Sequence, residues 1–329
     1  ISNLYSKNQL EGSFTEIKIL DKISSKNTLL KLKNGELLKQ FANKEVIITS
    51  GSFITPKLLM LSGIGNRKEL SKVGIDCLID LPGVGENLID HPECPLIARA
   101  NGKYGYYKQS QGWRMLKNGL QFLLFGTGPV NSTGVEAGAF INPINQDDLA
   151  YIQAFFVPSI YMNSDTIGVI KDDYGMSITT VMTKPKSRGS VKLKSNNPDD
   201  MPIIELNLLK DQDDLEMMMA GQRFFLQAFQ KGDLGDKVKE IIIPEVSKLD
   251  DNKLADHCKK FVRTNYHPSG TAKMGADNDE MAVLDSKLRV RGVDNLRVCD
   301  LSAVPNINSG NTSAPAIMLG LRCGDILTS

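Results

Sequence analysis

The pattern of apolar and polar residues divides the chain into regions of different secondary structure. Residues 15–20 and 28–33 alternate as strands do, and an Asn-Gly turn follows the second of them. Residues 45–49 form a short apolar, β-branched run, which is typical of a strand buried on both faces of a parallel or mixed sheet. A helix is predicted to open at Thr55, because the proline that follows is tolerated in a first helical turn.

The middle of the chain has a different character from its two ends. Between residues 150 and 193, several β-rich runs separated by turn signals predict an antiparallel sheet. Further helices are predicted at residues 113–125, 211–230, 253–264 and 314–327, with a late buried strand at residues 295–298. The order α/β, β-rich, α/β favours a domain built from both ends of the chain around an inserted one. The predicted boundaries are 1–92, 93–265 and 266–329.

Composition narrows the class of protein. The 329 residues are 41% hydrophobic and 23% charged, as in ordinary globular proteins, and no apolar run approaches the ~18 residues of a membrane span. With 39 basic and 38 acidic residues, the charge balance excludes a general nucleic-acid binder. Five scattered cysteines show neither metal spacing nor a disulfide framework. We expect a soluble protein, favour a cytoplasmic location, and expect a chain that opens at Ile1 without a signal-peptide pattern to be a portion of something longer.

Only three histidines are candidates for acid–base chemistry. His257 lies in a polar helical stretch and is predicted to be a solvated surface residue. His91, in a Gly-rich loop, is predicted to make structural hydrogen bonds. His267 stands in a loop shaped by Pro and Gly, where functional residues are frequent, so a catalytic and a structural role are both open.

Single motifs do not identify an activity. The chain has no G-x-S-x-G nucleophile motif, no H-E-x-x-H metal motif and no G-x-G-x-x-G dinucleotide motif. Taken by residue types alone, the sequence indicates an α/β enzyme of unknown activity.

An ordered set of six motifs is more informative. They lie at residues 51–65, 83–92, 187–193, 267–285, 295–300 and 310–315. In this order they resemble the signatures of the glucose–methanol–choline (GMC) oxidoreductase family, and the resemblance covers about residues 45 to 329. Residues 120–141 are similar to the choline-dehydrogenase-like alcohol dehydrogenases of that family.

The resemblance implies both a fold and a reaction. The fold is mixed α/β: residues 1–92 and 266–329 belong to a Rossmann-like FAD-binding domain, and residues 93–265 form a substrate domain on an antiparallel sheet with helices. The reaction is the FAD-dependent oxidation of a small alcohol to a carbonyl compound by hydride transfer to flavin N5. Oxygen, a quinone or another acceptor then takes the electrons.

The resemblance also assigns site residues. His267 matches the family's general base, a task that suits a neutral imidazole near pH 7. Asn311 matches the partner position, where its amide donates a hydrogen bond to the developing alkoxide; its structural alternative is a helix N-cap. The residues expected to bind FAD are Thr49, Ser50 and Gly51 at the ADP portion, Asp300 and Leu301 at the ribityl–pyrophosphate, and Thr312 and Ser313 at the isoalloxazine ring.

Two features leave alternatives open. Glu93 stands where choline-oxidising relatives hold a carboxylate against a cationic substrate, although a solvated surface carboxylate is the favoured interpretation. The family's G-x-G-x-x-G segment is missing, so we expect a companion chain to supply it. The alternative functions are a non-redox lyase of the same family and a non-catalytic subunit of a flavoprotein complex.

Overall fold

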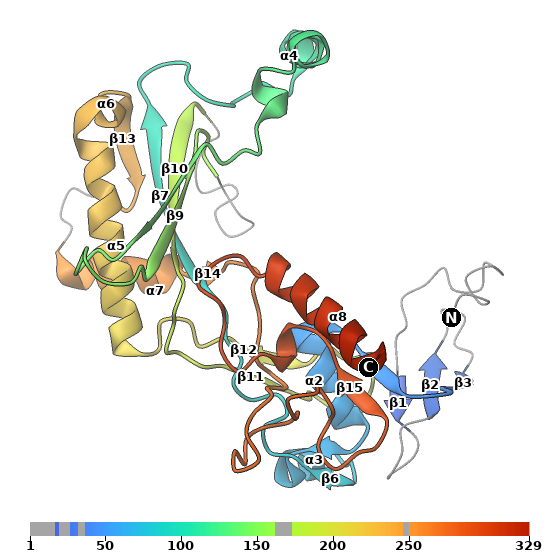
Figure 1. The fold of residues 1–329 in the computed structure, drawn as a ribbon. Coiled ribbons are helices and arrows are strands. Elements are labelled where there is room, and N and C mark those ends of the chain that lie inside the picture. Colours follow the sequence, from blue (N-terminus) through green and yellow to red (C-terminus); the bar gives the residue numbers. More distant parts are fainter. Residues whose placement is uncertain (1–16, 20–26, 32–36, 162–172, 246–249, 329) are drawn as a thin grey trace. The chain divides into compact units, whose positions relative to one another are not determined.

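The computed structural model describes residues 17–19, 27–31, 37–161, 173–245 and 250–328 (Figure 1). They fall into two compact units, each made from separate stretches of chain. The first unit comprises Ile1–Asp90, Arg188–Asn207 and Tyr266–Ser329, and the second comprises His91–Ser187 and Leu208–Asn265. Along the sequence, the second unit is inserted between segments of the first, with boundaries after residues 90, 187, 207 and 265.

The predicted division needs one correction. The sequence pattern places residues 188–207 in the inserted domain, whereas in the structure they belong to the first unit. They form the hairpin of β11 (Ser190–Lys192) and β12 (Ile203–Glu205), which packs against helix α2 (Gly51–Leu61). Gly189 pairs with Leu88, and a Cβ at Gly189 would lie 2.0 Å from a backbone oxygen of the hairpin. The pairing of Gly189 with Leu88, which a strand pattern does not reveal, ties the hairpin to the rest of the first unit.

The first unit contains a two-stranded parallel sheet. The run at residues 45–49 forms β4 (Val46–Ile48), which pairs with β15 (Leu296–Val298). Both strands are predicted from the sequence as buried strands. β4 leads directly into α2. Within the described residues Ile47 remains 38% exposed, so one side of this parallel strand is not covered by the part of the chain that the structure describes.

Smaller elements complete the first unit. The amino-terminal strands form an antiparallel sheet, while the predicted Asn-Gly turn lies outside the described residues. Aliphatic side chains from α2, β15 and the loops between residues 272 and 298 make the core of this unit. Its remaining elements are β1 (Ile17–Ile19), β2 (Asn27–Lys31), β3 (Leu37–Phe41), β5 (Ile64–Gly65), α3 (Arg67–Lys72), β6 (Ile79–Asp80), η3 (Leu301–Ala303) and α8 (Ser313–Thr328).

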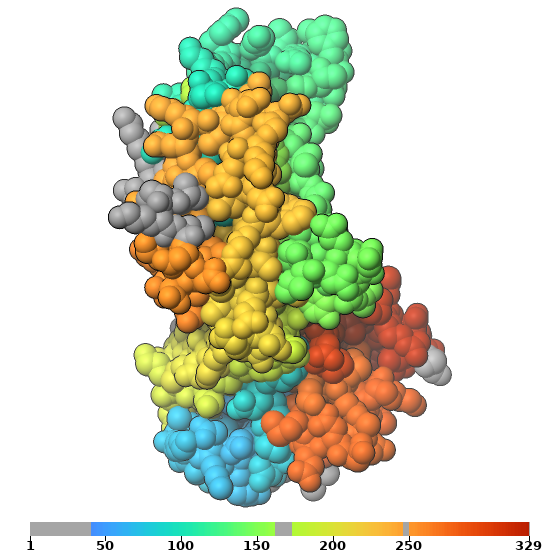
Figure 2. Space-filling view, turned by 90° about the vertical axis from the view of Figure 1, so that its left-hand side faces the viewer, coloured from blue at the N-terminus to red at the C-terminus, as the bar shows by residue number. Residues whose placement is uncertain are grey.

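The second unit is built on a six-stranded antiparallel sheet, as predicted for the β-rich middle. Its order is β13-β7-β10-β9-β8, and β14 also pairs with β7. Helices α5 (Gln212–Gln230) and α7 (Asp251–Phe261) pack against it, and α5 runs along the face seen in Figure 2. The strands are β7 (Pro92–Ala100), β8 (Ala137–Ile141), β9 (Ile152–Val157), β10 (Gly175–Met182), β13 (Val238–Ile243) and β14 (Arg263–Thr264). The mixed α/β fold class is confirmed.

Helix α4 (Gly112–Phe125) follows β7 and stands apart from the sheet of its own unit (Figure 1). It packs on the 3-10 turn η1 (Pro129–Asn131) and ends at Gly126, as the predicted breaker requires. Short α6 (Gly232–Gly235) follows α5. One stripe of α4 carries large apolar side chains, each more than half exposed: Trp113, Leu116, Leu120, Leu123 and Leu124. No helix among the described residues is long and apolar enough to span a bilayer.

Candidate functional site

The loop that carries His267 begins where β14 ends. Tyr266 adopts a left-handed backbone with φ of 61°, a conformation that costs a residue with a Cβ about 1–2 kcal/mol. This sharp turn leads to His267, whose N–H donates to Asp90 Oδ1 at 3.1 Å. The His267 side chain is partly buried, and this burial lowers the pKa of the imidazole from its usual value of 6.5. A neutral imidazole is therefore favoured at pH 7.

Hydrogen bonds connect the His267 loop to the start of α2. Ser52 Oγ donates to the carbonyl of Pro268 at 2.7 Å, and Thr271 Oγ1 donates to the carbonyl of Ser52 at 2.7 Å. The same loop is bonded to η3, because the N–H of Gly270 donates to the carbonyl of Leu301 at 2.9 Å. The structure thus brings together the start of α2, the His267 loop and η3. The start of α2 lies more than 200 residues before the other two segments in the sequence.

Asp300 joins two of the predicted cofactor-binding segments. Its Oδ2 accepts from the N–H of Gly51 at 3.0 Å and from Thr55 Oγ1 at 2.6 Å, while Oδ1 accepts from the N–H of Ser302 at 2.8 Å. Asp300 therefore acts as the cap of α2. The strand–turn–helix corner at Ser50-Gly51 does attract an anion, and that anion is a carboxylate of the chain itself.

Asn311 precedes the first turn of α8. The helix begins at Ser313, and the carbonyl of Thr312 accepts from the N–H of Ala316 at 3.0 Å, so Thr312 holds the capping position. Asn311 stands one residue before this position, and its roles as a substrate contact and as a cap stay predictions. Asn311 is exposed, and its backbone carbonyl accepts from Asn308 Nδ2 at 3.2 Å. The structure leaves the Asn311 side chain at the surface of the first unit.

The predicted cofactor residues suit a ligand with phosphate and hydroxyl groups. Thr49, Ser50 and Ser313 are exposed and carry hydroxyl groups that can donate or accept hydrogen bonds. The first turn of α8 contains no acidic side chain, so the partial positive charge of this helix end is not offset within the helix. Ser302 Oγ, next to Leu301, is buried and has no hydrogen-bond partner within the described residues. This donor set fits a flavin cofactor.

Glu93 belongs to the second unit and is neither solvated nor unpaired. Its side chain is 6% exposed and forms an ion pair with Arg263, whose side chain is 10% exposed. Arg263 also lies over the ring of Tyr161, 5.3 Å from its centroid. Burial raises the pKa of Glu93, and the Arg263 guanidinium opposes this rise. The favoured interpretation of Glu93 as a surface carboxylate is therefore wrong. Strand β14 pairs with β7 and places Arg263 directly opposite Glu93.

The other two histidines lie in the second unit as well. His91 is fully buried, and its carbonyl accepts from the N–H of Asn265 at 3.0 Å. The prediction of a surface location for His257 is wrong, since the residue is 7% exposed with its Nε2 3.6 Å from Cys94 Sγ. Together with Leu254 and Cys258 it forms the buried face of α7. Burial, with a smaller contribution from Lys260, lowers its pKa to about 4.

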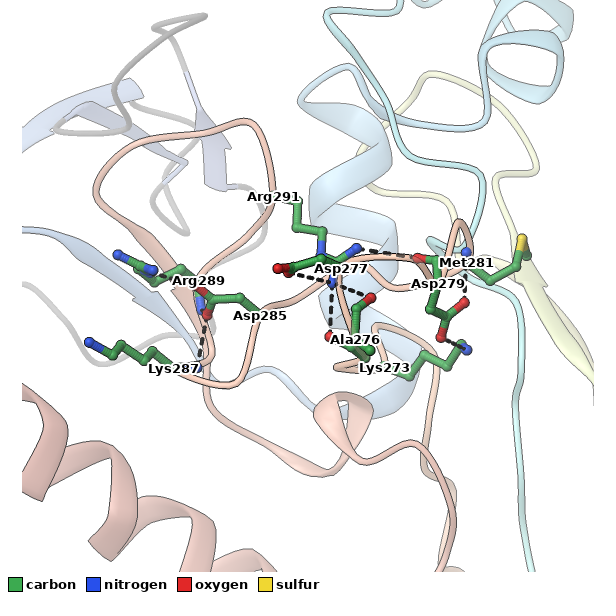
Figure 3. A network of polar contacts seen from close by, with 10 residues as sticks. Lys273, Ala276, Asp277, Asp279, Met281, Asp285, Lys287, Arg289 and Arg291 are labelled. Atoms are coloured by element: carbon green, nitrogen blue, oxygen red, sulfur yellow. Dashed lines mark hydrogen bonds and ion pairs between the residues drawn. The ribbon is translucent and has the colours of Figure 1, made fainter.

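A polar network shapes the chain that follows the His267 loop (Figure 3). Arg291 donates to the carbonyls of Gly275 and Ala276, both at 2.8 Å. Lys273 pairs with Asp279 at 2.5 Å. Such bonds replace regular secondary structure here and return the chain towards β15. Sequence reasoning assigned no role to this network.

Asp90 was also missed. The sequence offered one signal, its place between a Gly-rich turn and His91-Pro92, but nothing in the pattern connects it with a residue 177 positions later. Only the folded chain shows that its carboxylate, 4% exposed, meets the backbone of His267.

Two family profiles match this chain, and both describe GMC oxidoreductases. The amino-terminal profile matches residues 26–93 and the carboxy-terminal profile matches residues 185–320. Together they cover more than half of the sequence, including the segments that hold Asp90, His267 and Asp300.

Relatives and solved structures point the same way. The chain is 35% identical over 287 residues to an alcohol dehydrogenase [acceptor] of Pseudomonas putida, covering 86% of this chain and 51% of that protein. It is 33% identical over 296 residues to human mitochondrial choline dehydrogenase, covering 90% and 50%. A structure of formate oxidase from Aspergillus oryzae, studied for its FAD modification, superposes with a TM-score of 0.83 at 27% identity, covering 96% of this chain and 59% of that one. The chain spans about half the length of the curated relatives it matches.

Proposed function

Because the chain belongs to the GMC oxidoreductase family, we propose that it carries the alcohol-oxidising site of an FAD-dependent dehydrogenase or oxidase. The observation that carries this proposal is the junction at which the His267 loop, the start of α2 and the Asp300 segment are bonded to one another. FAD is the predicted cofactor, and the hydroxyl groups and helix terminus described above suit it. When bound, FAD supplies the acceptor for the hydride that leaves the carbinol carbon.

His267 is proposed as the general base. Oxidation of an alcohol requires the hydroxyl proton to leave before or with the hydride, and a ring nitrogen of a neutral imidazole takes that proton. The lowered pKa of His267 keeps its ring nitrogen available at neutral pH. Hydrogen bonds to the backbone of the loop fix the position of His267. The base therefore needs little rearrangement before it accepts the proton.

Asn311 is proposed to assist on the other side of the same step. Its side-chain amide donates a hydrogen bond to the alcohol oxygen as negative charge develops there. An uncharged donor stabilises the alkoxide without repelling the imidazolium that forms on His267. Its exposed position just before α8 is compatible with contact to a bound substrate.

The experiment is anaerobic reduction of the flavin-loaded protein by a panel of small alcohols, including choline and neutral primary alcohols. Loss of the yellow colour is expected with at least one alcohol. Replacing His267 with Ala is expected to slow this reduction by about 100-fold or more. His257→Gln is the matched histidine control and is expected to reduce at the normal rate at pH 7.

Three results would contradict the proposal. Near-normal reduction of the His267→Ala protein removes His267 from the role of base. A yellow protein that no alcohol bleaches favours the non-redox lyase, and a complex with the companion chain that takes up no flavin favours the non-catalytic subunit.

We also propose that a companion chain with a G-x-G-x-x-G segment completes the flavin site. Support comes from Ile47 on the uncovered side of parallel β4 and from the exposed apolar side chains of Ile317, Met318 and Leu321 on α8. Parallel sheets are normally covered on both faces, and apolar patches of this kind mark contact surfaces. Co-purification followed by mass measurement is expected to reveal a partner of roughly domain size; a flavin-loaded chain without any partner would refute the companion.

A further inference from the structure

The backbone of the His267 loop is bonded at nearly every position. The N–H and carbonyl of Ser269 both pair with Ile89, at 2.8 and 2.9 Å. The carbonyl of His267 accepts from Ser269 Oγ at 3.0 Å, and the carbonyl of Gly270 accepts from Asn87 Nδ2 at 3.2 Å. Gly270 has a φ of +90°, and a Cβ there would lie 2.6 Å from the carbonyl oxygen of Asn87. The loop therefore has little freedom to move against residues 87–90.

Within this framework one bond differs in kind from the others. The N–H of His267 is held by a carboxylate, Asp90 Oδ1 at 3.1 Å, while the neighbouring contacts use neutral groups. Asp90 is buried, so its carboxylate has few alternative positions.

The position of this bond is also distinctive. It acts on the residue immediately after Tyr266, whose left-handed backbone is unfavourable for a tyrosine. A strained conformation persists only where the surroundings hold it. Asp90 holds the amide that follows the strained residue, while Ile89 holds Ser269 two residues further on.

We propose that Asp90 is a positioning residue for His267: its carboxylate holds the His267 amide and thereby sets the direction in which the imidazole leaves the backbone. The inference rests on the proposed role of His267 as the base. Asp90 contacts the backbone of His267, so its effect on the reaction passes through that residue. A small rotation of the loop displaces a base from its proton, and displacements of about 1 Å can cost on the order of 100-fold in rate.

The test compares five variants of the flavin-loaded protein by anaerobic reduction with its best alcohol. Asp90→Ala removes the acceptor and is expected to slow reduction by about 10- to 100-fold. Asp90→Asn keeps an oxygen acceptor of the same shape and is expected to stay within about threefold of the wild type. Asp213→Ala, which removes an exposed carboxylate of α5 that pairs with Lys186, is the matched control and is expected to have no effect.

The double variant Asp90→Ala/His267→Ala separates positioning from general stability. If Asp90 acts only through His267, the double variant is expected to reduce no more slowly than His267→Ala alone. Multiplied losses would overturn the proposal. Equal losses in Asp90→Asn and Asp90→Ala would also overturn it, because the amide oxygen should replace the carboxylate as acceptor.

A second readout does not depend on catalysis. With only three histidines in the chain, ring resonances in an NMR spectrum can be assigned by substitution. The His267 ring signal is expected to shift in Asp90→Ala and to keep its position in Asp90→Asn, while the signal of His257 remains unchanged in both variants. An unshifted His267 signal in Asp90→Ala overturns the positioning role. Normal reduction of His267→Ala, by contrast, overturns the proposed base and is a separate result.

Discussion

His257 makes the second unit sensitive to acid in a way that can be calculated. The imidazole is buried against Cys94 and the ring of Phe261, and its pKa in the folded chain is about 4, compared with 6.5 when it is freely solvated. Between these two values the unfolded chain binds a proton that the folded chain excludes. The free energy of unfolding therefore falls as the pH falls from about 6.5 towards 4.

The magnitude follows from linkage. A difference of one pKa unit corresponds to 1.36 kcal/mol, so the contribution of His257 to stability falls by about 2 kcal/mol between pH 7 and pH 5. His257→Gln replaces the imidazole with a polar group that does not titrate. Between pH 7 and pH 5, the free energy of unfolding of the variant is expected to fall by about 2 kcal/mol less than that of the wild type. This difference does not depend on the stability of the variant at pH 7.

The assay is urea unfolding at several pH values, followed by far-UV circular dichroism. Comparing the pH dependence of the two proteins cancels the titration of carboxylates that they share. Parallel stability curves for wild type and His257→Gln between pH 7 and 5 would refute the reasoning. They would show that the imidazole is protonated in the folded chain despite its burial.

Three further predictions concern the candidate site and its surroundings. Glu93→Ala leaves the Arg263 guanidinium buried without its carboxylate partner. The free energy of unfolding, measured with urea, is expected to fall by about 3–5 kcal/mol, much more than on loss of an exposed ion pair. Asp300→Ala removes the cap of α2 and is expected to lower the free energy of unfolding by about 2 kcal/mol and to release flavin, measured by denaturation and by absorbance after gel filtration. The rate of flavin reduction is expected to fall with decreasing pH through a pKa below 6.5, as the lowered pKa of His267 requires; a midpoint above 7 would contradict it.

Local patterns predicted several elements because those elements depend on nearby residues. Asp211 accepts from the N–H of Asp213 and starts α5 where the sequence indicated. The apolar run at residues 45–49 forms a parallel strand, β4, and its β-branched side chains explain this preference. The order of six motifs also indicated the family, which both profiles confirm.

Long-range contacts explain what the sequence did not show. Helix α2 begins at Gly51, four residues before the predicted start, because Asp300 caps it from a segment 249 residues away. Pro56 therefore lies inside the helix and not in its first turn. The burial of His257 depends on the apolar face of α7, which a stretch rich in Asp and Lys conceals. In each case a partner distant in sequence determines the outcome.

The Glu93–Arg263 pair bears on the charge of the substrate. A carboxylate attracts a quaternary ammonium group strongly only if its own charge is not already offset. The negative charge of Glu93 is offset by the buried guanidinium of Arg263. The positive charge of this guanidinium would itself repel a cation brought close to the pair. Binding a cationic alcohol through Glu93 would require this ion pair to separate, at a cost that a neutral alcohol avoids. We therefore expect the alcohol panel to favour neutral substrates, and a preference for choline that persists in Glu93→Gln would place cation recognition at other residues.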